Sequence, residues 1–170
     1  MAEPMMAGII QPRVAAVLNV TPDHLDRHGS MERYAGLKAR LFQRQTEDDF
    51  RVQPLGDRRI ELLLRTMKSK PLWFGFADPT GEGVWEEGGS LRYRFAGRSG
   101  VLIRRAEASL PGPHNTENMA AASAAALAVG IPERAVAAAL REFRGLPHRL
   151  TLVAEIDGVK YVNDSKATNV

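Results

Sequence analysis

Hydrophobic residues along the chain fall into short continuous runs and into segments with helical spacing. Residues 14–20 form one continuous run between Pro12 and Pro22, which is typical of a strand buried on both faces of a parallel sheet. In residues 31–44 the large apolar side chains recur with the period of a helix, and Ser30 is a suitable N-cap. A strand followed by a helix indicates an α/β domain.

The pattern continues toward the C-terminus. We expect a buried strand at 72–76, an antiparallel excursion at 91–95 and 101–103, and helices at 116–129 and 131–144. The predicted fold class is therefore α/β, with a mainly parallel sheet flanked by helices and an antiparallel excursion.

Of two further segments, residues 151–163 have a clear secondary-structure pattern and residues 45–70 have a weak one. Asp157-Gly158 is favoured in a type I′ turn, so residues 151–156 and 159–163 are predicted to pair as a hairpin. In contrast, residues 45–70 are difficult to interpret: 60–67 has a helical pattern, but the strand expected at 50–54 is poorly defined.

Composition narrows the class of protein. With 170 residues, 44% of them hydrophobic, the chain is long enough for one ordinary core, and it contains no cysteine for disulfides or thiolate metal sites. The formal charge is only +3 and basic residues are interleaved with acidic ones, so nucleic-acid binding is not expected. No apolar run resembles a membrane span and no signal-peptide pattern opens the chain, so a cytoplasmic protein is expected.

Lys38 is predicted to lie on the buried face of the 31–44 helix, four residues after Tyr34 and three before Leu41. A buried ammonium group is costly unless it is paired or becomes neutral, and a neutral amine can capture carbon dioxide as a metal-binding carbamate. The alternative is a lysine whose stem lines the core while its ammonium group reaches water. Helical spacing alone favours this alternative.

Two histidines form a possible metal site. His24 and His28 lie four residues apart beside Asp23 and Asp26, and this mixture of nitrogen and oxygen donors suits a divalent cation. Residues of these types are equally common as caps and turn residues at a strand-to-helix junction.

Two asparagines form a possible site for a flat heterocycle. Asn115 and Asn118 share one face at a helix start, where their amides can pair with ring donors and acceptors. Helix capping by Asn115 is the alternative.

Polar residues near the C-terminus suggest an anion site. Arg149 follows the turn formed by residues 145–148, and its guanidinium group is suited to phosphate oxygens. Residues 163–169 crowd polar side chains after an apolar strand, where α/β folds often bind ligands, although such residues also simply begin loops.

Together, these segments resemble the Mur ligase family. They occur in the family's order and approximate spacing: residues 19–30 with Lys38, His114-Asn115 with Asn118, residues 145–149, and residues 163–169. The resemblance runs from about Val14 to Asn169. It implies that residues 1–150 belong to the family's central ATP-binding domain and that residues 151–170 begin its C-terminal domain.

The last two segments are most similar to the branch of the family that adds D-glutamate to UDP-N-acetylmuramoyl-L-alanine in peptidoglycan synthesis. This implies an ATP-dependent ligase that works through an acyl phosphate with Mg²⁺. By the same resemblance, His24 is a magnesium ligand, Lys38 as a carbamate helps to hold a second magnesium ion, and Thr168 lies close to the incoming D-glutamate. Such groups would neutralise charge on a transferring phosphoryl group and on a tetrahedral oxyanion.

The resemblance also implies a nucleotide site. Asn115 and Asn118 correspond to the pair that contacts adenine, Arg149 to the arginine near the ATP phosphates, and Asp164 and Lys166 to polar residues on the nucleotide side.

The chain departs from the family in two places. No segment matches Gly-x-x-x-x-Gly-Lys-Ser/Thr, the loop that holds the ATP phosphates, and we expect this loop to lie before Met1. Residues 52–57 also depart from the family's Val-x-Asn-x-Asp-Asp pattern, which puts one strand in doubt. We therefore expect an incomplete central domain that does not turn over substrate by itself.

Two alternatives stay open. One is a related amide ligase, either another Mur ligase or a folylpolyglutamate synthase. The other is a degenerate binding module that keeps the fold without catalysis.

Overall fold

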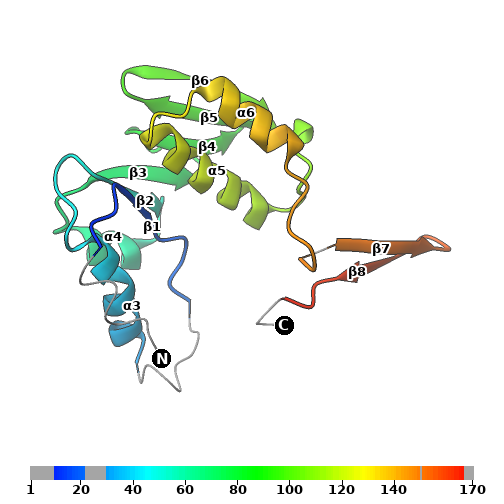
Figure 1. Ribbon diagram of the computed structural model, residues 1–170, viewed down its shortest axis with the longest axis horizontal. Coiled ribbons are helices and arrows are strands. Elements are labelled where there is room, and N and C mark those ends of the chain that lie inside the picture. Colours follow the sequence, from blue (N-terminus) through cyan, green and yellow to red (C-terminus); the bar gives the residue numbers. More distant parts are fainter. Residues whose placement is uncertain (1–9, 22–29, 150, 167–170) are drawn as a thin grey trace.

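The computed structural model describes residues 10–21, 30–149 and 151–166. Its main feature is a sheet whose strand order follows the chain order, β1-β2-β3-β4-β5-β6 (Figure 1). The strands are β1 (Val14–Ala16), β2 (Phe50–Pro54), β3 (Lys70–Gly75), β4 (Gly83–Glu87), β5 (Ser90–Phe95) and β6 (Arg98–Arg104). Strands β1 to β4 pair in parallel, whereas β5 and β6 are antiparallel. The predicted fold class is confirmed, including its antiparallel excursion.

The doubtful strand at 50–54 is present and pairs with a neighbour on each side. Its polar residues made the strand hard to predict from the sequence. In the structure two of them are paired with each other, since Arg51 Nε donates a hydrogen bond to Gln53 Oε1 at 3.0 Å. Gln45, which is buried, adds an amide that donates to the carbonyl oxygens of Pro12 (3.1 Å) and Phe50 (2.8 Å). These hydrogen bonds hold the N-terminal ends of β1 and β2 together.

Helices cover both faces of the sheet. The helices are α3 (Met31–Ala39), α4 (Arg58–Leu64), α5 (Pro113–Ala128) and α6 (Glu133–Glu142), with 3-10 turns at Arg40–Phe42 and Arg105–Glu107. Neighbouring residues of a strand point to opposite faces. Accordingly, Val14 packs with the core that contains α5 and α6, whereas Ala15 packs with the core that contains α3 and α4. Figure 1 shows α5 and α6 lying together on one side of the sheet.

The buried face of α3 differs from the prediction. Ala35, Ala39 and Phe42 are buried, whereas Leu41 is 37% exposed. The prediction placed the buried face by the large apolar side chains alone. The helix instead packs through its alanines, whose small size lets it approach the sheet closely. Lys38 therefore lies beside this face rather than at its centre. The α-helix also ends at Ala39, earlier than expected, and continues to Phe42 as a 3-10 turn.

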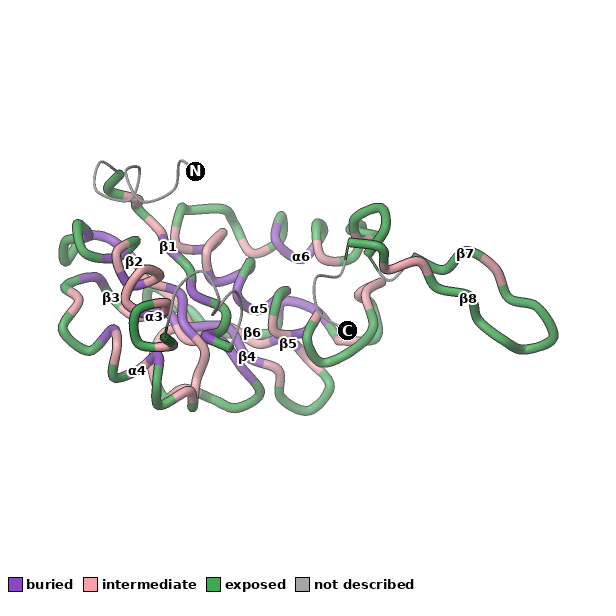
Figure 2. Tube along the Cα trace, turned by 90° about the horizontal axis from the view of Figure 1, so that it is seen from below, coloured by how far each residue is buried: buried purple, intermediate pink, exposed green. Residues whose placement is uncertain are grey.

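The C-terminal hairpin forms a separate two-stranded sheet, β7 (Thr151–Ile156) with β8 (Val159–Asn163). Asp157 and Gly158 both have positive φ, 52° and 78°, as the predicted type I′ turn requires. The hairpin projects from the body (Figure 1), and nearly all of it is exposed along the tube in Figure 2. Among the described residues, no helix combines the length and apolar composition of a bilayer span.

Candidate functional site

A cavity of about 590 Å³ lies between the start of α5, the linker after α6 and the base of the hairpin. We call it the asparagine cavity, because Asn115 and Asn118 line it. Arg149 from the linker and Asp164 from the segment after β8 line it as well. Four residues that the sequence analysis selected as nucleotide-binding are thus brought together from separate parts of the chain.

The start of α5 fixes the two asparagines. Gly112 is the N-cap, with a φ of 92° that favours glycine, and Pro113 opens the helix. The amide of Asn115 donates to the carbonyl oxygen of Pro111 at 2.7 Å, so the alternative in which Asn115 caps the helix is wrong. The amide is instead anchored to the entry loop beside the cavity, and Asn118 follows one turn later.

Arg105, which the sequence analysis did not select, anchors the same loop. Its Nε donates to Thr116 Oγ1 at 2.8 Å, and its Nη2 donates to the carbonyl oxygen of Leu110. One guanidinium group thereby joins the end of β6, the entry loop and the first turn of α5. Nothing in the local sequence signals this role, because it depends on a contact between separate elements.

The linker after α6 brings Arg149 to the cavity. Gly145 has a φ of 93°, and the amide of Arg149 donates to the carbonyl oxygen of Leu146 at 3.2 Å, which closes a turn. The backbone amide of Lys166 donates to the carbonyl oxygen of His148, also at 3.2 Å. Lys166 is exposed and its side chain does not line the cavity, unlike Asp164.

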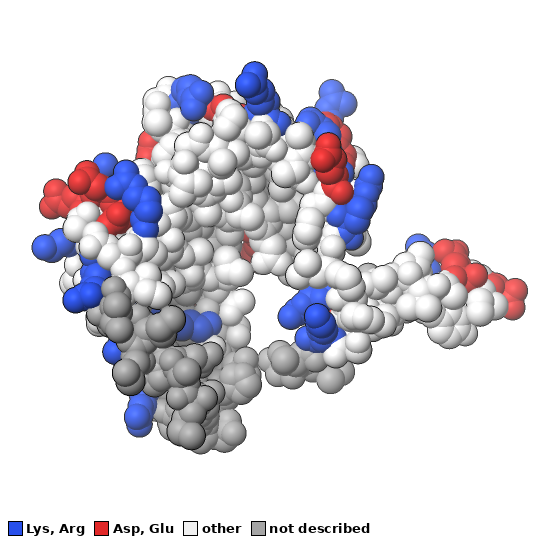
Figure 3. All heavy atoms as spheres, in the orientation of Figure 1, with Lys and Arg blue, Asp and Glu red and all other residues white. Residues whose placement is uncertain are grey.

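Charge at the cavity is positive on the linker side, where Arg144 and Arg149 line it. In Figure 3, basic side chains gather at the foot of the hairpin, whereas acidic and basic side chains are interspersed over the rest of the face shown. The cavity therefore offers amides at one end and guanidinium groups at the other, an arrangement suited to a heterocycle that carries a phosphate chain.

Lys38 lies at a second hollow, of about 430 Å³, beside residues 16–19 at the end of β1. Its Nζ donates to the carbonyl oxygen of Asn19 at 2.9 Å and lies 4.8 Å from the centroid of the Tyr34 ring. The amine is therefore paired with a carbonyl oxygen and an aromatic ring rather than isolated in the core. The prediction of an amine buried in an apolar face is wrong: Lys38 is half-buried and paired, with its amine directed to the carboxyl end of the sheet.

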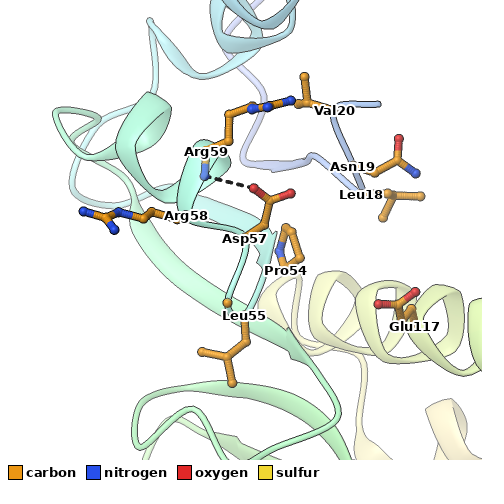
Figure 4. A pocket seen from close by; sticks show the side chains of 10 residues that line it. Leu18, Asn19, Val20, Pro54, Leu55, Asp57, Arg58, Arg59 and Glu117 are labelled. Atoms are coloured by element: carbon orange, nitrogen blue, oxygen red, sulfur yellow. Dashed lines mark hydrogen bonds between the residues drawn. The ribbon is translucent and has the colours of Figure 1, made fainter. Parts of the chain in front are cut away.

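A third hollow, of about 580 Å³, opens where β1 and β2 end (Figure 4). Asn19, Asp57 and Glu117 surround it from three different elements. Asp57 is the N-cap of α4, and its Oδ1 accepts from the amides of Arg59 (3.0 Å) and Ile60 (3.1 Å). The carboxyl ends of parallel strands are where open α/β sheets bind ligands. Glu117, which lies between Asn115 and Asn118 in the sequence, was not predicted as a site residue.

Several selected residues lie outside the described part of the chain. They are Asp23, His24, Asp26, His28 and Thr168. Within residues 10–21, 30–149 and 151–166, no group of three or more histidine or acidic side chains is placed to hold a metal ion.

Comparison with known proteins agrees with this architecture. Residues 1–126 match the family described as the Mur ligase middle domain. The chain is 47% identical over 163 residues to the UDP-N-acetylmuramoylalanine–D-glutamate ligase of Pelotomaculum thermopropionicum, covering 96% of this chain and 36% of that protein. It is 40% identical over 167 residues to the enzyme of the same name from Geobacillus kaustophilus, again covering 36% of it. The chain thus spans about a third of the length of these relatives.

Solved structures share the fold. MurF from Acinetobacter baumannii superposes with a TM-score of 0.71 at 21% identity, covering 93% of this chain and 35% of that one. A pseudomurein peptide ligase type C from Methanothermus fervidus superposes with a TM-score of 0.67 at 14% identity, covering 89% of this chain and 38% of that one. With most of its residues matched by the middle-domain family and its fold shared with these ligases, the chain belongs to the Mur ligase family.

Proposed function

We propose that this chain is the central, nucleotide-binding part of a ligase that joins D-glutamate to UDP-N-acetylmuramoyl-L-alanine with ATP in peptidoglycan synthesis. Relatives that are 40–47% identical carry the name of this enzyme, and the chain aligns with about a third of each. In this proposal residues 1–150 belong to the central domain and residues 151–170 begin the next one. The separate sheet of the hairpin supports that boundary.

The observation that carries the proposal is the asparagine cavity. Its amides come from α5, its two arginines from the linker after α6 and its carboxylate from the segment after β8. The volume of about 590 Å³ lies within the range of small-ligand sites, about 300–1,000 Å³. We assign Asn115 and Asn118 to the adenine ring, Arg149 to the phosphates, and Asp164 to the sugar side of the nucleotide, with Lys166 nearby.

ATP would supply the phosphoryl group that activates the substrate carboxylate. In this scheme Asn115 and Asn118 orient the base, and the apolar side chains of Leu110, Phe143 and Leu146 around the cavity exclude water from the ring faces. Arg149 holds a fixed positive charge where the phosphate chain would lie.

Magnesium is a separate part of the proposal. The described residues do not form a metal site by themselves, because a lysine ammonium group is a donor only and no three histidine or acidic side chains among them are grouped to hold a metal ion. We propose His24 as a ligand, Lys38 as a ligand once carbamylated, and Thr168 as a residue near D-glutamate.

The test uses the protein encoded by the complete reading frame that contains these residues, with ATP, Mg²⁺ and UDP-N-acetylmuramoyl-L-alanine. Phosphate release and product mass are followed for D-glutamate and, separately, L-lysine, meso-diaminopimelate and L-glutamate on a folate acceptor. We expect product with D-glutamate only. The 170-residue chain alone should give none, since it contains no Gly-Lys phosphate loop.

Other outcomes would separate the alternatives. Product with a different amino acid would identify another ligase of the family. The complete protein binding a ligand without phosphate release would favour a non-catalytic module.

A further inference from the structure

The linker after α6 and the segment after β8 meet at one pair of side chains. The side-chain amide of Asn163, the last residue of β8, lies with Nδ2 3.1 Å from Nδ1 of His148. The backbone amide of Lys166 donates to the carbonyl oxygen of the same histidine at 3.2 Å. His148 is therefore held through its ring by the last residue of the hairpin and through its main chain by a residue that follows the hairpin.

A second hydrogen bond fixes the direction of the first. Oδ1 of Asn163 accepts from the backbone amide of Ser165 at 3.0 Å, so the Nδ2 group, a donor, faces the imidazole. With Nδ2 as the donor, Nδ1 of His148 is the acceptor, which corresponds to the tautomer with its hydrogen on Nε2. The contact thus specifies one tautomer.

The backbone of His148 is also unusual. Its φ is 64°, in the left-handed region that few non-glycine residues adopt, although histidine is among those enriched there. Such a conformation persists where surrounding contacts hold it. The hydrogen bonds from Asn163 at the end of β8 and from Lys166 beyond it are contacts of this kind.

Each partner of this pair adjoins a residue of the asparagine cavity. Arg149 directly follows His148, and Asp164 directly follows Asn163. Arg149 and Asp164 both line the cavity, although their own segments are joined to the body through different elements. The contact between His148 and Asn163 therefore joins the two segments that carry the guanidinium and carboxylate groups.

We infer that His148 and Asn163 are positioning residues that place Arg149 and Asp164 around the nucleotide, with no contact to the nucleotide of their own. This inference rests on the proposed function, since it assigns a nucleotide to the cavity. The hydrogen bond between the two side chains also selects one imidazole tautomer in the parent, which gives the test a spectroscopic readout besides affinity.

The test compares variants of the protein encoded by the complete reading frame. Asn163→Ala removes the donor, and we expect ATP affinity to fall about three- to tenfold, in line with the loss of one hydrogen bond. Asn163→Asp keeps the acceptor for Ser165 but faces the ring with a carboxylate, so the contact re-forms with a hydrogen on Nδ1 and affinity should return to within about twofold. Val162→Thr, an exposed neighbour on β8, is the matched control and should bind ATP as the parent does.

Calorimetric titration with ATP gives the affinities, and imidazole ¹⁵N chemical shifts give the tautomer, with His148→Asn identifying the resonance. We expect Nδ1 of His148 to be an acceptor in the parent and to carry a hydrogen in Asn163→Asp. Equal ATP affinity for the parent and Asn163→Ala, or a parent ring with its hydrogen on Nδ1, would overturn the inference. No ATP binding by the parent, with the expected tautomer present, would instead refute the nucleotide assignment while confirming the contact.

Discussion

Arg105 donates a hydrogen bond from Nε to Oγ1 of Thr116 at 2.8 Å and so joins the end of β6 to the first turn of α5. The same guanidinium group donates to the carbonyl oxygen of Leu110 in the entry loop. The loop carries Pro111, whose carbonyl oxygen anchors the amide of Asn115. The position of the candidate adenine contact therefore depends on an arginine outside the cavity.

Replacement of Arg105 by lysine should weaken nucleotide binding. A lysine has one ammonium group and cannot reproduce the two directions of the guanidinium fork. We expect ATP affinity of the protein from the complete reading frame to fall about tenfold, the loss of about one charge-assisted hydrogen bond. Calorimetric titration measures this. Arg104→Lys, on the exposed neighbouring position, is the control, and equal losses in both variants would contradict the role of Arg105.

Replacement of Asn118 should reduce discrimination between bases. If its amide pairs with adenine, Asn118→Ala should lower ATP affinity about tenfold and GTP affinity much less, because a buried polar edge of the base is left unpaired. Competition binding with both nucleotides checks this. An equal loss for ATP and GTP would place Asn118 away from the base.

Lys38→Arg should show whether ligase activity depends on a positive charge at this position or on a carbamate. Arginine keeps a cation near the Tyr34 ring and the Asn19 carbonyl oxygen but does not become a neutral amine, so it forms no carbamate. We expect ligase activity of the complete protein to fall at least about 100-fold, the scale expected when a catalytic metal ligand or its support is lost. The melting temperature should change little. Full activity in Lys38→Arg would show that the lysine acts only as a cation.

Two glycines should respond in opposite ways to alanine. A Cβ at Gly83 would lie 2.1 Å from the carbonyl oxygen of Trp73, so Gly83→Ala forces β3 and β4 apart and should cost about 2–4 kcal/mol of the free energy of unfolding. Gly36 lies within α3 with open space around it, and Gly36→Ala should add about 0.5–1 kcal/mol. Urea denaturation of the 170-residue chain measures both. Similar effects at the two positions would contradict the close approach at Gly83.

The ion pair between Glu107 and Arg141 should make stability depend on pH. The Arg141 side chain donates to the Glu107 carboxylate at 2.6 Å, and this contact, with the backbone amide of Arg104, lowers the pKa of Glu107 below its ordinary value of 4.5. A carboxylate whose pKa is lowered by folding stabilises the folded state fully at a pH above its ordinary, unfolded-state pKa. This contribution is lost as the pH falls through the folded-state pKa. Both side chains are largely exposed, so the effect should be small.

Urea midpoints at pH 6 and pH 3 for the parent and Glu107→Gln test this linkage. The parent should be slightly more stable than Glu107→Gln at pH 6, and the difference should shrink toward pH 3. A difference that grows on acidification would have the wrong sign for a carboxylate paired with arginine.

Much of the architecture could be predicted from local patterns. Ser30 caps α3 as expected, with its Oγ accepting from the amide of Arg33 at 3.3 Å, because capping depends only on residues within one turn. The hairpin turn at Asp157-Gly158 is likewise a local property of its two residues. Strand β5 follows from the alternation of apolar and polar residues at 91–95, and part of β6 from the apolar residues at 101–103.

Other features depend on contacts between distant residues, and only the tertiary structure decided them. The strand at 50–54 was difficult to predict because it contains polar residues. It is stabilised by contacts that local sequence does not show, with Gln45 and with a neighbouring strand on each side. The surroundings of Lys38 were misjudged because α3 packs through its alanines. Motif order along the sequence selected Asn115, Asn118, Arg149 and Asp164, but their meeting in one cavity follows from packing between distant segments. Arg105, and His148 with Asn163, form hydrogen bonds that join such segments. Local sequence determines caps, turns and periodicity, whereas long-range packing determines which polar side chains come together.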